Sequence, residues 1–312
     1  MTTHSHPDRL RATLIGFIAI LLWATLALFT TATGAVPPFQ LLSLTFGIAF
    51  AVSLLRWAWL ARRDAEAFRR IFRQPWPVWA LGIAGLFGYH ALYFTALDHA
   101  PPVEASLICF LWPLLIVLLS AALPGERLHW THLLGGALGL GGAALLVLQR
   151  ADGAVAFEAQ YIVGYLAALG CAFTWSIYSV MSRRFGTAPT DLVGAFCGAT
   201  ALLGLVAHVL VGEPTVWPAG AWEWAAVVAL GLGPVGVAFF VWDYGVKHGD
   251  IKALGACSYA SPLLSTVLLI LAGKAEATTT VIVACLMIIG GAVIASRDLW
   301  MRKRSQPAAR ST

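Results

Sequence analysis

Apolar residues occur along this chain in ten stretches of roughly twenty, each separated from the next by a short polar segment. A helix of about 20 apolar residues crosses the roughly 30 Å hydrocarbon layer of a bilayer with its backbone groups bonded internally. The pattern therefore predicts an all-α integral membrane protein with ten transmembrane helices. The predicted spans are Leu14–Thr33, Phe39–Leu60, Val78–Leu97, Val103–Leu123, His132–Gln149, Tyr161–Ser182, Leu192–Val211, Trp222–Gly245, Ile251–Leu271 and Thr278–Ser296.

The basic residues predict how the chain is oriented. Of the 20 Lys and Arg, 18 fall in the termini and the loops on the same side as the termini, and only Arg150 and Lys274 fall on the other side. Basic residues resist translocation, so both termini are expected in the cytoplasm. Because Arg9 and Arg11 precede a long first stretch without a cleavage site, this stretch is expected to remain as an anchor.

Composition narrows the possible functions. The 312 residues are 59% apolar and 11% charged, with a net charge of +5. The cations are spread over every loop of one side instead of forming one patch, which argues against a nucleic-acid partner. The five cysteines lie inside predicted spans without CxxC spacing, and no catalytic motif is present. We therefore expect no disulfide, metal, cofactor or catalytic residue, and no enzyme.

The chain divides near residue 155 into a first repeat, 1–155, and a second repeat, 156–312, with five predicted spans in each. Five is odd, so the second half enters the membrane from the opposite face, and any likeness between the halves indicates an inverted repeat. The matches at an offset of 149 positions are His99 with His248, Phe110 with Tyr259, and Pro-Leu-Leu at Pro113 with Pro-Leu-Leu at Pro262. Two complete repeats in one chain make an obligate protein partner unnecessary.

Helix-breaking residues lie in the middle of three predicted spans. Pro113 and Pro262 each remove a backbone donor, and Gly233 with Pro234 interrupts the eighth stretch. Such breaks are tolerated where neighbouring helices or a water-filled cavity satisfy the freed carbonyls. We predict that these four residues act as hinges around a central transport site, although glycines in such helices also serve close packing, as expected for Gly135, Gly139 and Gly142.

With these features the chain resembles the drug/metabolite transporter superfamily of EamA type. The resemblance covers roughly residues 12 to 298 and rests on the ten spans in two repeats and on four short motifs. The motifs are Leu22-Trp23-Ala24, Thr174-Trp175-Ser176, Ser182-Arg183-Arg184, and Pro-Leu-Leu followed by Gly-Glu between Pro113 and Glu126. The aromatic-rich helices are most similar to the YddG-type exporters of aromatic amino acids. This resemblance implies a central cavity, bounded by spans 1, 3, 4, 6, 8 and 9, in the bacterial cytoplasmic (inner) membrane.

Aromatic residues form two groups. The first lies at the membrane surface, where Trp anchors helices: Trp57, Trp59, Trp76, Trp79, Trp130, Trp217, Trp222, Trp224 and Trp300. The second lies deeper, and we take it as the candidate substrate-binding set: Trp23, Tyr89, His90, Tyr93, Trp112, Trp175, Tyr178 and Trp242. Rings of this set would bind a flat apolar side chain by stacking and an ammonium group over a π face. The alternative is that the rings fill space between helices.

The ionisable residues within the spans could have structural or functional roles. His90 is assigned either to substrate contact, to a structural hydrogen bond or to proton relay. Asp243 is expected to pair with Lys247 one turn later. Asp98, His99, Glu104 and His208 are expected as solvated helix ends.

Together these features favour a transporter that exports aromatic and other large neutral amino acids by alternating access. The alternative is an exporter of planar xenobiotics or of another small metabolite. The first stretch lacks an acidic residue, which argues against cation extrusion by a buried glutamate. Energy coupling and oligomeric state stay open.

Overall fold

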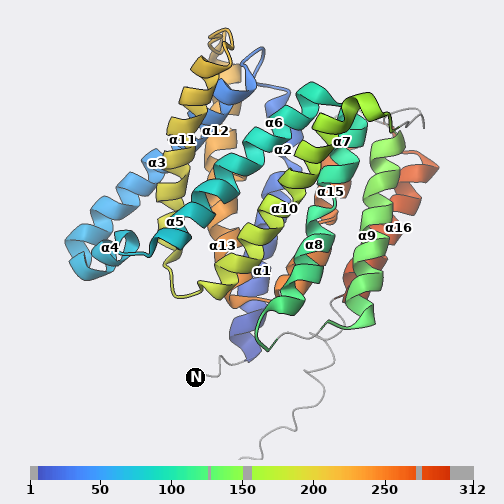
Figure 1. The fold of residues 1–312 in the computed structure, drawn as a ribbon, viewed down its shortest axis with the longest axis horizontal. Coiled ribbons are helices and arrows are strands. Elements are labelled where there is room, and N and C mark those ends of the chain that lie inside the picture. Colours follow the sequence, from blue (N-terminus) through green and yellow to red (C-terminus); the bar gives the residue numbers. More distant parts are fainter. Residues whose placement is uncertain (1–5, 126–127, 150–156, 272–275, 296–312) are drawn as a thin grey trace, which may run out of the picture.

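The computed structural model describes residues 6–125, 128–149, 157–271 and 276–295, and within these residues every regular element is helical (Figure 1). The all-α prediction is confirmed. The α-helices are α1 (His6–Ala24), α2 (Leu26–Thr30), α3 (Pro38–Arg63), α4 (Ala65–Phe72), α5 (Trp76–Ile83), α6 (Tyr89–His99), α7 (Pro102–Cys109), α8 (Trp112–Leu119), α9 (Trp130–Gln149), α10 (Ile162–Arg184), α11 (Val193–Leu210), α12 (Ala221–Leu232), α13 (Ala238–His248), α14 (Ile251–Cys257), α15 (Ala260–Leu271) and α16 (Thr279–Ala295). Two π-helical segments, η1 (Ala84–Gly88) and η5 (Gly233–Val237), join α5 to α6 and α12 to α13. Short 3-10 turns are η2 (Ser120–Ala122), η3 (Ala159–Tyr161) and η4 (Thr190–Leu192).

Eight segments of the described chain are long and apolar enough to cross a membrane. They correspond to the first eight predicted spans, with ends that differ by a few residues. The ninth predicted span is divided into α14 and α15, and the tenth is α16, an apolar helix of 17 residues. The protein is therefore a helical bundle suited to the interior of a lipid bilayer.

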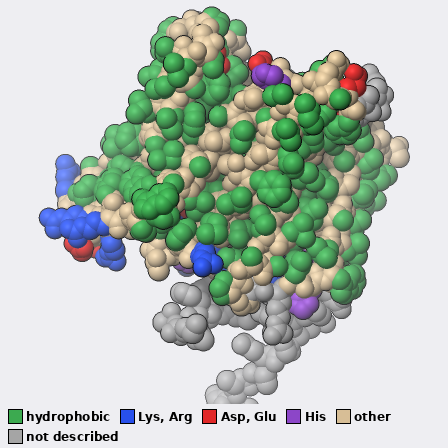
Figure 2. All heavy atoms as spheres, viewed as in Figure 1, with side chains coloured by type: hydrophobic (Ala, Val, Ile, Leu, Met, Phe, Trp, Pro, Cys, Tyr) green, Lys and Arg blue, Asp and Glu red, His purple; other side chains and the backbone are tan. Residues whose placement is uncertain are grey.

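One helix was not predicted. α4 is short and amphipathic, and Asp64 caps it by accepting a hydrogen bond from the amide of Ala67 at 2.9 Å. Its apolar face packs on the bundle through Phe68 and Phe72, while basic side chains gather over it (Figure 2, left edge). This is the arrangement of a helix that lies in the membrane interface.

Four helix pairs form the framework of the bundle: α1 with α13, α6 with α10, α3 with α11, and α9 with α16 (Figure 1). The α9–α16 contact depends on glycine. A Cβ at Gly135 would meet the backbone oxygen of Gly291, and one at Gly142 would meet Ile288. The predicted packing role of the glycine stripe is confirmed, since small residues let the two backbones approach.

The helix breaks lie where the helix-breaking residues were found in the sequence. Gly233 and Pro234 lie in η5, Pro113 is the second residue of α8, and Pro262 is the third of α15. Two further breaks are present. η1 interrupts the third span, and Thr25 separates α1 from α2 by returning its hydroxyl to the carbonyl of Leu22 at 2.7 Å.

Side chains satisfy the backbone groups that the breaks release. The hydroxyl of Tyr259, which lies between α14 and α15, accepts a hydrogen bond from the amide of Leu114 at 3.2 Å, at the start of α8. The indole of Trp23 donates to the carbonyl of Pro234 in η5 at 3.1 Å. The Ser176 hydroxyl shares its proton between the carbonyl of Trp112 at 2.9 Å and that of Ala172 in its own helix at 2.7 Å. The breaks thus cross-link helices that are distant in the sequence.

Candidate functional site

A cavity of about 450 Å³ lies in the centre of the bundle, where the broken helices face one another. Its walls come from α1, α2, α6, α7, α8, α9, α10, η5, α13 and α15. The lining is exposed toward α2 and the start of α7, where Leu26 and Pro102 lie, and becomes buried toward Trp112 and Trp175. The cavity therefore has an accessible end and a closed end.

Three tryptophans form the closed end, which we call the aromatic floor: Trp23, Trp112 and Trp175. The ring centroid of Trp23 lies 6.2 Å from that of Trp112 and 5.6 Å from that of Trp175, both with edge-to-face geometry. The Trp112 and Trp175 rings are 6.3 Å apart and also meet edge to face. Aromatic quadrupoles favour this geometry, so the floor is a rigid surface of rings.

One wall of the cavity is also aromatic. Tyr89 and Tyr93 of α6 have parallel rings with centroids 6.2 Å apart, and Tyr89 meets Trp175 at 5.7 Å. His90 lies beside them and its Nδ1 is 2.7 Å from the carbonyl of Leu86 in η1. A carbonyl accepts only, so Nδ1 donates and Nε2 is the acceptor of the neutral ring. The structural hydrogen bond weighed for His90 is present, and the residue also lines the cavity.

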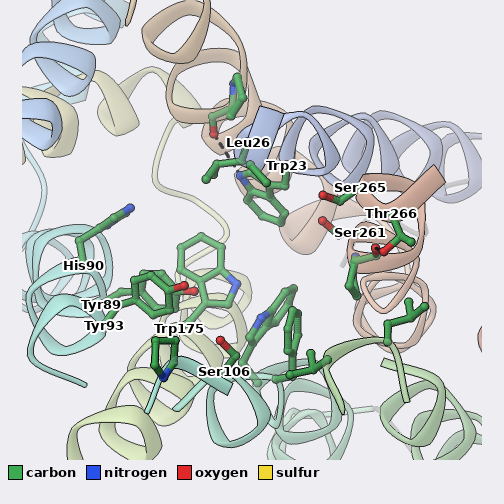
Figure 3. Close-up of a pocket in the computed structure, with 18 of the residues that line it drawn as sticks. Trp23, Leu26, Tyr89, His90, Tyr93, Ser106, Trp175, Ser261, Ser265 and Thr266 are labelled. Carbon is green, nitrogen blue, oxygen red and sulfur yellow. Dashed lines mark hydrogen bonds between the residues drawn. The ribbon is translucent and has the colours of Figure 1, made fainter. Parts of the chain in front are cut away.

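The opposite wall carries hydroxyl groups. Ser261, Ser265 and Thr266 of α15 lie across the cavity from the tyrosines, and Ser106 of α7 lies near the floor (Figure 3). Sequence reasoning missed all four. The signal that indicates them is the spacing of Ser261 and Ser265, one helical turn apart on either side of Pro262, in an otherwise apolar span.

Six of the eight candidate substrate-binding residues line the cavity: Trp23, Tyr89, His90, Tyr93, Trp112 and Trp175. Tyr178 and Trp242 lie one layer deeper, outside its lining, and both are fully buried. The Trp242 ring packs under the floor, 5.1 Å from Trp23, and its indole donates to Ser179 at 3.0 Å. Of the predicted hinges, Pro262 and Pro234 line the cavity, whereas Pro113 and Gly233 do not.

Polar contacts tie helices together below the floor. Lys247 donates to Asp243 at 2.7 Å, which confirms the predicted pair, and Thr190 donates to the same carboxylate at 2.7 Å. Arg9 of α1 pairs with Asp250 at 3.0 Å. These contacts join α1, η4, α13 and the start of α14 at the end of the bundle where the chain begins (Figure 1).

The ionisable residues at helix ends differ in part from expectation. Asp98 and His99 are solvated as predicted. Glu104 and His208 are not, because their side chains are 5% and 4% exposed. Glu104 accepts a hydrogen bond from Tyr165 at 2.6 Å, and His208 meets Glu213 at 2.8 Å. The prediction of solvation was wrong for these two, since each is buried against a polar partner, which is distant in the sequence for Glu104 and five residues away for His208.

The described residues contain no group of three His, Cys, Asp or Glu side chains placed to hold a metal ion. The five cysteines are free thiols within helices or at their breaks. The chemistry available at the cavity is therefore that of rings, hydroxyls and one imidazole.

A multi-pass helical bundle around such a cavity is the architecture of a membrane transporter. The chain belongs to the EamA-like transporter family, whose profile matches residues 10–148 and again residues 162–297. It is 56% identical to the aromatic amino acid exporter YddG of Ancylobacter novellus, with 93% of this chain and 98% of that protein covered.

More distant relatives carry similar names. The chain is 23% identical to the aromatic amino acid exporter YddG of Escherichia coli, with 92% of this chain and 97% of that protein covered. It is 27% identical to a probable terminal-alkyne amino-acid exporter of Streptantibioticus cattleyicolor, with 92% and 97% covered. A crystal structure of 55% sequence identity superposes with a TM-score of 0.87 and covers 96% of this chain and 100% of that one.

Proposed function

We propose that this protein exports aromatic and other large neutral amino acids across the bacterial cytoplasmic membrane. The observation that carries the proposal is the two-sided cavity, with rings on α6 and α10 and hydroxyls on α15 (Figure 3). The similarity over nearly the whole chain to a protein named as an aromatic amino acid exporter supports it independently.

The two sides of the cavity suit the two ends of such a substrate. An aromatic side chain gains about 0.5–1.5 kcal/mol for each ring it meets in edge or offset geometry, and Tyr89, Trp112 and Trp175 offer three. The ammonium and carboxylate groups need donors and acceptors when they leave water. Ser261 and Ser265 supply hydroxyls that act as both, whereas Thr266 donates to the carbonyl of Pro262 at 2.9 Å and offers a substrate only an acceptor. The substrate would therefore lie with its ring toward α6 and its charged end toward α15.

The transport pathway follows from ten crossings arranged as two inverted five-helix repeats, residues 1–155 and 156–312. Three features support this arrangement. The π segments 84–88 and 233–237 are 149 positions apart, as are the breaks at Phe110 and Tyr259. The contact of α1 with α13 corresponds to that of α10 with α6 under the same offset. The family profile matches once in each half. Both termini would lie in the cytoplasm, and the chain would need no obligate protein partner.

Alternating access would operate by rocking the two halves about the helix breaks. The four hinge residues lie at or beside those breaks and would let the helices bend there: Pro113, Pro262, Gly233 and Pro234. The aromatic floor and the ion pair of Arg9 with Asp250 close the side nearest the chain start, which is the proposed cytoplasmic side. For export, the contacts that close this side would have to separate when the opposite side of the cavity closes.

The test is efflux from sealed liposomes that contain the purified protein. Vesicles are loaded with radiolabelled Phe, Trp, Leu or Thr, and release into amino acid-free buffer is measured against protein-free vesicles. We expect saturable release of Phe and Trp, with unlabelled Trp as a competitor. Release of a planar aromatic cation without competition by amino acids would instead favour the xenobiotic exporter. A pH jump across the membrane in the same assay decides whether flux is coupled to protons.

A further inference from the structure

A second cavity, of about 370 Å³, lies on the flank of the bundle where α3 passes α12, η5 and α13. Its floor is buried and includes Ala49 and Ser53 of α3. Its rim is formed by Val52, Leu232 and Val237, which are about half exposed. Since α3 and α12 belong to segments suited to span the membrane, side chains exposed on them meet lipid. The cavity is therefore a groove open to the hydrocarbon layer, separate from the central cavity.

The groove exists because glycine and a helix break coincide. Gly231 and Gly236 line it on either side of the Gly233–Pro234 break, where the backbone itself forms the wall beside α3. The backbones of α3 and α12 approach closely there, since a Cβ on Gly231 would meet the backbone oxygen of Thr45 and the side chain of Ile48. An apolar hollow of this kind, facing a bilayer, is filled by lipid chains because water has no polar partners in it.

The depth of the groove matches one leaflet. Ala49 lies near the middle of α3, and Arg56 lies seven residues closer to its basic end, about 10 Å away at 1.5 Å per residue. Half of the hydrocarbon layer is about 15 Å thick. The groove thus runs from the bilayer centre to the interface at which Arg62, Arg63 and α4 lie. An acyl chain that entered it would bring its headgroup to Arg56.

The mouth of the groove carries one positive and one negative group. The Nε of Arg56 lies 3.3 Å from Oδ1 of Asp191, and the two side chains are 50% and 28% exposed. The guanidinium of Arg56 also lies over the ring of Trp59 at 4.8 Å, which fixes its position. A headgroup with a phosphate and a primary ammonium complements this pair, since guanidinium binds phosphate and carboxylate accepts from N–H.

We infer that the groove between α3 and η5 binds phosphatidylethanolamine, with one acyl chain against Ala49 and Gly236, the phosphate at Arg56 and the ammonium at Asp191. Phosphatidylglycerol lacks the cation that Asp191 accepts, and phosphatidylcholine lacks the N–H donors. The bound lipid supports the wall of the central cavity, because Pro234 and Val235 of η5 line that cavity while Gly236 and Val237 line the groove.

Native mass spectrometry of the purified full-length protein, titrated with 1-palmitoyl-2-oleoyl-phosphatidylethanolamine, tests the inference. Val52→Phe fills the groove from its rim, and Leu55→Phe adds the same ring at a lipid-facing position of α3 outside the lining. Arg56→Gln removes the phosphate contact, and Arg62→Gln removes an equal charge from the same helix end. We expect Val52→Phe and Arg56→Gln to weaken binding about tenfold and both controls to bind like the parent protein.

Thermal unfolding without added lipid shows whether each variant folds, and Arg56→Gln decides the question if Val52→Phe does not fold. Equal weakening in the controls would overturn the inference, and so would phosphatidylglycerol or phosphatidylcholine bound as tightly as phosphatidylethanolamine. Loss of a dimer peak in Val52→Phe would identify a second copy as the occupant. Displacement of the lipid by tryptophan would identify transport substrate there, and either result contradicts the lipid site.

Discussion

Tyr259 and Trp23 illustrate how single side chains stabilise the broken helices. Each carries an apolar ring into the bundle and directs one polar atom at a backbone group that a break has released. A buried amide or carbonyl left without a partner costs about 1–3 kcal/mol, so these two bonds help to determine where the breaks lie. The same residues border the cavity or contact residues that do, which links the breaks to the site.

Replacing Tyr259 by Phe is expected to destabilise the fold. The substitution keeps the ring but leaves the amide of Leu114 without its acceptor, at a cost of about 1–3 kcal/mol. The unfolding temperature in detergent should fall by several degrees. The matched control is Tyr244→Phe, because the Tyr244 side chain is more than a third exposed. An unchanged unfolding temperature for Tyr259→Phe would mean that another group satisfies the amide.

Trp175→Ala is expected to weaken both the fold and transport, because the residue is 4% exposed and deleting a buried ring of this size costs about 3–5 kcal/mol. The ring contributes to the floor and meets Tyr89, and one lost ring contact with substrate is worth about 0.5–1.5 kcal/mol, or a two- to twelvefold higher half-saturating concentration. The measurement is the concentration dependence of Trp efflux from liposomes. Trp222→Ala is the control, since Trp222 is among the most exposed rings of the chain. Equal effects of both variants would remove Trp175 from the substrate site.

The sequence predicted the aromatic lining better than the polar one. Trp23, Trp112 and Trp175 could be selected because large rings deep in a span are conspicuous, and depth follows from the hydropathy pattern alone. Which face of a helix points into the cavity does not follow from depth, so Trp242 and Tyr178 were selected with the others although they lie a layer below. Long-range partners were equally hidden. The sequence around Glu104 does not indicate that its carboxylate accepts a hydrogen bond from Tyr165, 61 residues away.

At the scale of elements, local chemistry determined what was predictable. Proline removes a donor wherever it occurs, so the breaks beside Pro113 and Pro262 and the segment at Pro234 follow from the sequence. The break at Thr25 and the π segment of the third span follow from no such residue. Thr25 donates its hydroxyl to a carbonyl of its own helix, and at the π segment a Cβ on Gly82 would meet Phe196 and one on Gly85 would meet Tyr178. Tertiary packing accompanies the π segment, whereas the contact at Thr25 is local.

The contact of α9 with α16 predicts opposite effects for two adjacent glycines. A Cβ at Gly291 would collide with the backbone oxygen of Gly135, so Gly291→Ala should separate the helices and cost about 1–3 kcal/mol. A Cβ at Gly290 meets nothing within 4 Å, so Gly290→Ala should stabilise the helix by about 0.5–1 kcal/mol. Unfolding of the two purified variants is compared under identical conditions. Similar stability of both would contradict the close approach of the two backbones at this position.

At the scale of the whole molecule, the basic residues of the first spans gather toward one end of the helical bundle. The basic residues of α3 and α4 lie toward the end of the bundle where α1 begins (Figures 1 and 2). The exposed pair Asp98 and His99 lies at the far end of the third span. This separation is what the excess of Lys and Arg in alternate loops predicts. The inverted arrangement of the two halves makes a separate prediction about the side of the membrane on which equivalent residues lie.

Cysteine labelling at the two equivalent histidines supplies that test. His99 and His248 are both exposed, end the third and eighth spans, and are 149 positions apart. An inverted repeat puts them on opposite sides of the membrane, whereas a parallel repeat would put them on the same side. We expect a membrane-impermeant maleimide added to intact cells to label His99→Cys and to label His248→Cys only after permeabilisation. The parent protein gives the background from the five native cysteines, which lie within helices or at their breaks. Labelling of both variants in intact cells would contradict the inversion, because no rotation about an axis in the membrane plane leaves two equivalent positions on one face.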